Sequence, residues 1–149
     1  NKWARLDGGR IRRFRTVMTG ELFNLLREHS ILADLLAGPA ENDDAFARGV
    51  SRGLEESCLT AELFKIRARV LLGQADAADA ASYGSGLLIG TDVRAGLQEG
   101  RDREIVVMGR PELMRLYEEA LKIAGRQSRQ VDGEEAFLAG ATKIVEMLE

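Results

Sequence analysis

The chain has one cysteine and one histidine among its 149 residues. Cys58 therefore has no intramolecular disulfide partner, which is typical of a protein in a reducing compartment. His29 cannot form a multi-histidine metal site alone, and its position near the end of an expected helix favours a structural role. No apolar run is long enough for a membrane span, and no signal peptide is visible in the sequence.

Two common nucleotide-binding motifs are also missing. The phosphate loop G-x-x-x-x-G-K-[ST] does not occur, and residues 84–90, GSGLLIG, are one residue too long for a dinucleotide fingerprint. Gly86 and Gly90 lie one turn apart on an expected helix. Since each glycine costs a helix about 1 kcal/mol relative to alanine, we expect a compensating close approach of another backbone or a ligand.

Charge is unevenly distributed along a chain whose net charge is −3. Residues 1–15 carry six basic side chains against a single acid, Asp7, so their local charge is +5. The simplest interpretation is a solvated basic face. A nucleic-acid-binding module is an alternative, and a steep salt dependence of binding would support it.

Length and composition are typical of one globular domain with its own core. Hydrophobic residues make up 45% and charged residues 30% of the sequence. The sequence opens on Asn1-Lys2-Trp3, without a methionine and directly in a strand pattern. We therefore expect an excised piece of a longer protein.

The clearest local pattern is a strand, a turn and a helix between residues 104 and 125. Residues 104–108 form an apolar, β-branched run that predicts a buried strand. Gly109 permits the turn, Pro111 suits the first helical position, and Gly125 is placed to end the helix. Unpartnered N–H groups at such a helix start can bind ligands, although a purely structural turn is the alternative.

The first half of the chain predicts a hairpin followed by helices. Strands at residues 2–6 and 10–17 flank an Asp-Gly-Gly turn, and a bulge is expected because Ile11 and Phe14 do not alternate. Thr19 and Thr60 are expected to cap two of the helices. The helical starts are expected at Thr19, Ser30, Asn42, Thr60 and Ala75.

The C-terminal part predicts a parallel βαβα arrangement. After the strand and helix above, residues 127–131 predict a second strand, and Asp132-Gly133 predicts the start of a last helix with one buried face. An antiparallel hairpin combined with this unit indicates an α/β fold with one mixed sheet flanked by helices. The long helical block reads as an insertion after the hairpin.

Several runs resemble the 2-dehydro-3-deoxygalactonokinase family, and the resemblance spans nearly the whole chain. The most specific runs are residues 19–23, TGELF, and residues 85–90, SGLLIG. Further matching segments are Lys2-Trp3, Arg10-Ile11, residues 14–18, residues 25–32, Leu63-Phe64, Arg67-Ala68, Ser82-Tyr83 and residues 106–109.

The resemblance implies a ribonuclease-H-like domain of the actin/hexokinase type. Residues 1–149 would be a single domain, the C-terminal half of a two-domain sugar-acid kinase. Its N-terminal domain would hold a further phosphate loop and the catalytic base, and the last helix, through Ala139-Gly140, would connect the two domains. Asn1 and Lys2 would be a remnant of the family's phosphate-binding run, with Asn1 in place of the usual serine.

Further site residues follow from the same resemblance. Gly109 and Arg110 are expected in the segment that contacts adenosine, and Gly86 is assigned to the same nucleotide site. The candidates for sugar-acid or magnesium contacts are Thr19, Gly20 and Glu21. Glu21 could orient the sugar acid or hold water on magnesium; equally, it could be a helix-start acid without a ligand.

The implied activity is ATP- and Mg²⁺-dependent phosphorylation of 2-dehydro-3-deoxy-D-galactonate at its 6-hydroxyl, in the cytoplasm and as part of galactonate degradation. The fragment alone is expected to be inactive, no direct metal ligand is expected, and a homodimer is left open. Neither nucleic acid nor membrane is an expected partner. The alternatives are a kinase of another sugar acid, or a regulatory or scaffold domain of the same fold.

Overall fold

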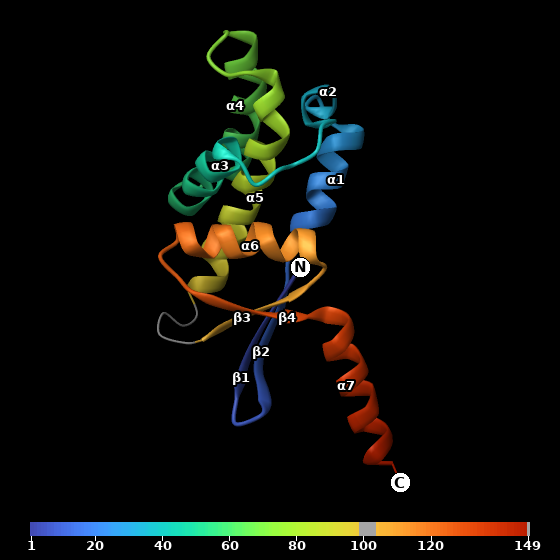
Figure 1. Ribbon diagram of the computed structural model, residues 1–149. Helices are drawn as coiled ribbons and strands as arrows, with labels where there is room; N and C mark the ends of the chain where they lie inside the picture. The colour runs from blue at the N-terminus through green and yellow to red at the C-terminus, as the bar shows by residue number, and fades with distance from the viewer. Residues whose placement is uncertain (99–103, 149) are drawn as a thin grey trace.

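The computed structural model describes residues 1–98 and 104–148 as an α/β protein with small sheets flanked by helices (Figure 1). Its elements in chain order are β1 (Lys2–Asp7), β2 (Arg10–Thr16), α1 (Thr19–His29), α2 (Ala33–Leu36), α3 (Asp44–Glu55), α4 (Leu59–Leu71), the 3₁₀ turn η1 (Ala77–Asp79), α5 (Ala80–Leu97), β3 (Ile105–Gly109), α6 (Pro111–Ile123), β4 (Ser128–Asp132) and α7 (Gly133–Glu146). No helix in these two ranges is both long and apolar enough to cross a membrane.

The hairpin contains the expected bulge. Arg5 pairs with Arg13, whereas the next residue, Leu6, pairs with Ile11, so Arg12 is the extra residue in β2. The bulge places Ile11 and Phe14 on the same face of the hairpin, because each pairs with an even-numbered residue of β1. Both side chains are exposed.

The prediction of one mixed sheet is wrong for the described residues. The β1–β2 hairpin and the parallel β3–β4 pair are separate two-stranded sheets. Side chains of Trp3 from β1 and of Ile105 and Val107 from β3 border a cavity between the two. This space is lined by side chains, and no strand-to-strand hydrogen bonds join β1 to β3 in the described sheets.

The core consists of two hydrophobic clusters that share α5. One cluster packs α5 against α2 and α4, and the other packs it against α3 and α6. In the second cluster, Phe46, Val50 and Val93 are fully buried. Helix α5 thus connects the helical part of the molecule to the strands (Figure 1).

The expected close approach at Gly86 is confirmed. A Cβ at Gly86 would lie 3.0 Å from the carbonyl carbon of Phe46 and 3.0 Å from the amide nitrogen of Val50 on α3. Two glycines of α3, Gly49 and Gly53, face the backbone of α5 in the same way. The two helices therefore touch through their backbones, a contact that any Cβ would obstruct.

Predicted helix ends were confirmed where aspartate or glycine marks them, but both threonine caps were wrong. Asp43 accepts from the Phe46 N–H at 2.8 Å, and Gly125 ends α6 with φ +72°. The capping positions of α1 and α4 are Met18 and Cys58, without side-chain cap bonds. The Thr19 hydroxyl instead donates to Asp92 on α5, a distant partner that local sequence does not reveal.

The buried face expected for α7 is also wrong. No residue of α7 is buried, and Phe137 is 72% exposed. The helix runs away from the rest of the molecule after β4 (Figure 1). The apolar periodicity specified one face of the helix, but no described element packs along it.

Candidate nucleotide site

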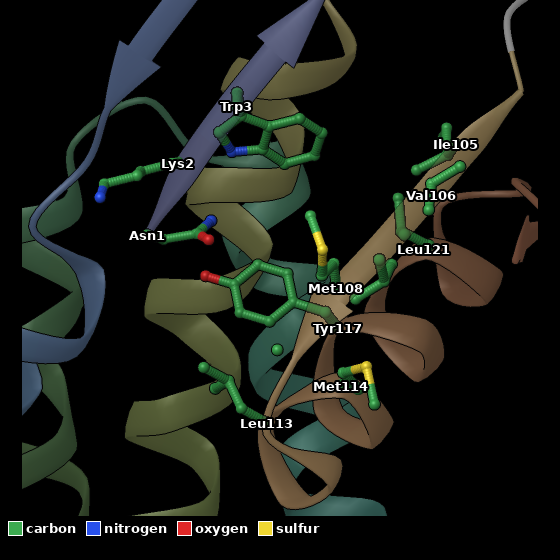
Figure 2. Close-up of a pocket in the computed structure, with 12 residues that line it drawn as sticks. Asn1, Lys2, Trp3, Ile105, Val106, Met108, Leu113, Met114, Tyr117 and Leu121 are labelled. Carbon is green, nitrogen blue, oxygen red and sulfur yellow. The ribbon is translucent and has the colours of Figure 1, made fainter. Parts of the chain in front are cut away.

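A cavity of about 90 Å³ lies between the start of the chain and the β3–α6 unit (Figure 2). Its lining residues come from β1 and its preceding residue, β3 and α6: Asn1, Lys2, Trp3, Ile105, Val106, Val107, Met108, Gly109, Leu113, Met114, Tyr117 and Leu121. The walls are mainly apolar, with the polar groups of Asn1, Trp3 and Tyr117 among them, whereas the Lys2 amine points away from the other lining residues (Figure 2). Such a combination is typical of small-molecule sites.

Three residues predicted from the sequence meet at this cavity. Asn1 and Lys2 line it from one side, and Gly109 lines it from the end of β3. More than 100 positions separate these two groups in the sequence. Arg110 directly follows Gly109, is exposed, and is not among the lining residues.

The remaining predicted residues lie elsewhere. Gly86 is buried at the crossing of α3 and α5 and does not line the cavity. Thr19 is buried in the first turn of α1, whereas Gly20 and Glu21 are exposed there. None of these residues lines the cavity at Gly109, although the Thr19 hydroxyl donates to the same acidic side chain, Asp92, as the cavity residue Asn1.

The turn after β3 is open above the backbone of Gly109. A Cβ built on Gly109 meets no atom within 4 Å. In the parallel register Gly109 pairs with Asp132, and a Cβ on Gly133 would lie 3.3 Å from the Gly109 Cα. The carboxyl ends of the two parallel strands thus lie together, where ligands of open α/β sheets usually bind.

The helices after these two strands start differently. Asp132 accepts the N–H groups of Glu134 and Glu135 at 2.9 and 3.0 Å and so caps α7. Helix α6 begins at Pro111, and the residue at its capping position, Arg110, makes no side-chain cap bond. The first turn of α6 can therefore donate N–H groups to an external acceptor.

Asp92 on α5 is the polar centre beside the cavity, and no sequence motif indicates a role for it in the site. Asp92 is 3% exposed, and its carboxylate accepts four hydrogen bonds. Oδ2 accepts from Asn1 Nδ2 at 2.8 Å, Thr19 Oγ1 at 2.7 Å and the Tyr117 hydroxyl at 2.6 Å, and Oδ1 accepts from Trp3 Nε1 at 2.8 Å. The available sequence signal was an acid within a small, apolar helical run.

Two further observations define the donors around Asp92. The Trp3 ring lies against Gly96, one turn after Asp92, where a Cβ would collide with the indole. Burial and the neighbouring Asp92 carboxylate raise the pKa of Tyr117. The phenol therefore remains a proton donor at neutral pH. Figure 2 shows the Asn1 and Tyr117 side chains pointing toward one another.

Comparison with known proteins identifies the family. The sequence model described as 2-keto-3-deoxy-galactonokinase matches residues 1–144. The chain belongs to the 2-keto-3-deoxy-galactonokinase family. This confirms the resemblance that the TGELF and SGLLIG runs indicated.

Relatives of this family cover almost the whole chain. A 2-dehydro-3-deoxygalactonokinase of Escherichia coli K12 is 35% identical over 145 residues, and a protein of Rhizobium meliloti 1021 named as a probable 2-dehydro-3-deoxygalactonokinase is 39% identical over 145 residues. These matches cover 96% and 94% of the chain but 49% and 47% of the relatives. The chain thus spans about half the length of these curated family members.

The similarity to this family extends to the three-dimensional structure, as a crystal structure shows. It describes a candidate 2-dehydro-3-deoxygalactonokinase from Sinorhizobium meliloti, with a TM-score of 0.91 and 36% identity. The similarity covers 99% of this chain and 50% of that one. Within the described part of this 2-keto-3-deoxy-galactonokinase family chain, no three His, Cys, Asp or Glu side chains gather as a metal site.

Proposed function

We propose that this chain is the nucleotide-side, C-terminal domain of an ATP-dependent kinase that phosphorylates 2-dehydro-3-deoxy-D-galactonate at its 6-hydroxyl. The observation that carries the proposal is the cavity at which Asn1 and Lys2 meet Gly109. The family resemblance assigns the first pair to phosphate binding and the glycine to adenosine. Their convergence is what one nucleotide site requires.

The cavity would take only part of a nucleotide. Its volume of about 90 Å³ is well below the roughly 300–1,000 Å³ of typical ligand pockets. The rest of the nucleotide would lie over the open backbone of Gly109 and the uncapped start of α6. Arg110 has a planar, permanently charged group that could stack on the base or meet a phosphate.

The chemistry is phosphoryl transfer, in which positioning and charge stabilisation supply most of the rate. The Lys2 side chain would have to turn toward the cavity to bring its positive charge to a phosphate, and the N–H groups at the start of α6 favour a phosphate. Magnesium would neutralise phosphate charge when bound, held mainly by the phosphates themselves. Glu21, exposed at the start of α1, would orient the sugar acid or a magnesium-bound water, with Thr19 and Gly20 beside it.

The other half of the kinase would cover the apolar surface that this chain leaves open. Phe137 and Leu148 of the C-terminal segment and Phe14 of the hairpin are all more than half exposed. We place the N-terminal domain against this surface, with α7 as the connecting helix, in a ribonuclease-H-like architecture of the actin/hexokinase type. Closure of the two domains would exclude water from the transferred phosphate.

Gly109→Val in the full-length protein tests the proposal. A side chain here has room in the folded protein but would occupy the space over the backbone, so we expect weaker ATP binding with an unchanged fold. Isothermal titration with ATP measures the effect, and circular dichroism monitors folding. Arg110→Ala should have a smaller effect if the guanidinium only stacks on the base.

Gly38→Val is the matched control, because Gly38 lies in a loop and its added Cβ would come no closer than 4.0 Å to the Ala81 Cβ. Equal ATP affinities in the wild type and Gly109→Val would place adenosine elsewhere and leave the turn purely structural. Wild-type protein without ATP binding would instead favour a regulatory or scaffold domain. Purified residues 1–149 should not phosphorylate the sugar acid, since half of the cleft would be missing.

A further inference from the structure

The Asp92 carboxylate joins segments that lie far apart in the sequence. Its donors come from the first residues of the chain, from α1 and from α6, and all four are uncharged groups. An ionised carboxylate has only acceptor sites, so it can satisfy all four donors at once. An amide of the same size cannot do this, because one of its two terminal atoms is a donor.

These donors stand on opposite walls of the candidate nucleotide cavity. Asn1 and Trp3 belong to the wall next to β1, whereas Tyr117 belongs to the wall formed by α6. Figure 2 shows Asn1 and Trp3 on the β1 segment and the Tyr117 ring extending from α6, with its hydroxyl toward Asn1. One carboxylate therefore links the two walls by hydrogen bonds, in addition to the apolar contacts of the second core cluster.

We propose that Asp92 is a positioning residue for the nucleotide, which holds the Asn1–Trp3 segment and α6 at the separation that the ligand requires. The inference rests on the proposed function, because it assumes that ATP occupies the cavity. Asp92 itself need not touch the ligand: it is buried behind the Asn1 amide and the Tyr117 hydroxyl. Its effect passes through the groups that it orients.

Trp3 strengthens this assignment because two contacts fix its ring. Its indole N–H donates to Asp92 Oδ1, and its flat face lies where Gly96 leaves room. Asp92 and Gly96 are one helical turn apart and so face the same side of α5. Helix α5 therefore provides both the acceptor and the space that orient the cavity wall at Trp3.

Asp92→Asn and Tyr117→Phe perturb this arrangement to different degrees. The asparagine amide turns an NH₂ donor toward at least one of the four existing donors. Tyr117→Phe removes only the link to α6 and preserves the aromatic ring. Tyr83→Phe is the matched control: Tyr83 is on the same helix as Asp92, but its hydroxyl contacts Arg69 at 3.4 Å, away from the cavity.

The experiment uses full-length protein, with ATP affinity from isothermal titration and with KM for ATP and kcat measured separately. We expect Asp92→Asn to raise the ATP dissociation constant and the KM for ATP about ten-fold or more, since misplaced binding groups lose much of their effect. Tyr117→Phe should shift both in the same direction by a smaller factor. Tyr83→Phe should leave both unchanged.

A purely structural role predicts a different pattern. Loss of folded protein would lower the apparent kcat while the remaining enzyme kept a wild-type KM for ATP. Wild-type ATP affinity in both Asp92→Asn and Tyr117→Phe would therefore overturn the inference, and if Asp92→Asn fails to fold, Tyr117→Phe decides alone. Wild-type protein that binds no ATP would overturn the proposed function and this inference with it.

Discussion

Two regions of the molecule, the surroundings of α5 and the helix α7, bury their apolar residues to very different extents. Around α5, the side chains of Leu36, Phe46 and Val93 have no measurable exposure. Along α7, Phe137 is 72% and Leu148, just beyond the helix, is 82% exposed. Both regions are rich in apolar residues, but only around α5 do other described elements pack against them. Amphipathic pattern identifies the side of a helix that requires a partner, and tertiary structure determines whether that partner is present.

The largest effect should come from truncating matched phenylalanines in the two regions. Phe46→Ala should destabilise residues 1–149 by about 3–5 kcal/mol, because it empties a buried site in the second core cluster. Phe137→Ala should change stability by less than about 0.5 kcal/mol in the same protein. Chemical denaturation measures both. Similar losses of stability at the two positions would show that α7 is packed in solution, and the contrast between the two regions would disappear.

A second comparison uses glycines on two helices. Gly86→Leu should destabilise by about 3 kcal/mol or more, because the new side chain meets the α3 backbone. Gly140→Leu on α7 is the control: its Cβ meets nothing within 4 Å, so the loss of glycine should be neutral or slightly stabilising. The thermal unfolding midpoint gives the difference. Equal midpoints would contradict the close approach of α3 and α5.

A smaller effect is expected in the well-packed region, where stability should depend on pH. The two hydrogen bonds from Arg52 to the buried Glu62, at 2.8 and 2.9 Å, hold the pKa of Glu62 at about 2, below its usual 4.5. The stability from this group is complete above pH 4.5 and is lost as pH falls toward 2. Glu62→Gln should lower the free energy of unfolding by about 1–3 kcal/mol at pH 7. It should also reduce the loss of stability between pH 4.5 and pH 2. Denaturation midpoints between pH 2 and 7 measure both effects. If the loss of stability at low pH were the same in the variant, Glu62 would not be its source.

Much of the element order could be predicted because it is encoded locally. The run from residue 104 through Gly109 and Pro111 contains a strand, a turn and a helix start that act within a few positions. The bulge in the hairpin followed from the spacing of Ile11 and Phe14 alone. The single mixed sheet was a wrong prediction, because whether the hairpin pairs with β3 depends on contacts between distant segments that no local pattern specifies.

The candidate site was predictable only in part, for the same reason. Asn1, Lys2 and Gly109 belong to runs that resemble a family, so the sequence alone indicates them as site residues. Only the folded structure shows that they line one cavity. Asp92 lies 73 positions from Thr19 and 91 from Asn1, and no local pattern connects them. A threonine at a helix start predicts a cap, but the acceptor of the Thr19 hydroxyl is distant in the sequence and no local pattern reveals it.

The crossing of α3 and α5 also limits how this sequence can change over generations. A crowded pair of side chains can be relieved by a smaller neighbour, which is how second-site suppressor mutations usually act on packing defects. At Gly49, Gly53, Gly86 and Gly90 the obstructing atoms belong to the opposite backbone, which every residue carries. No substitution of an adjacent side chain can make room there. A lineage must keep these glycines or separate the two helices.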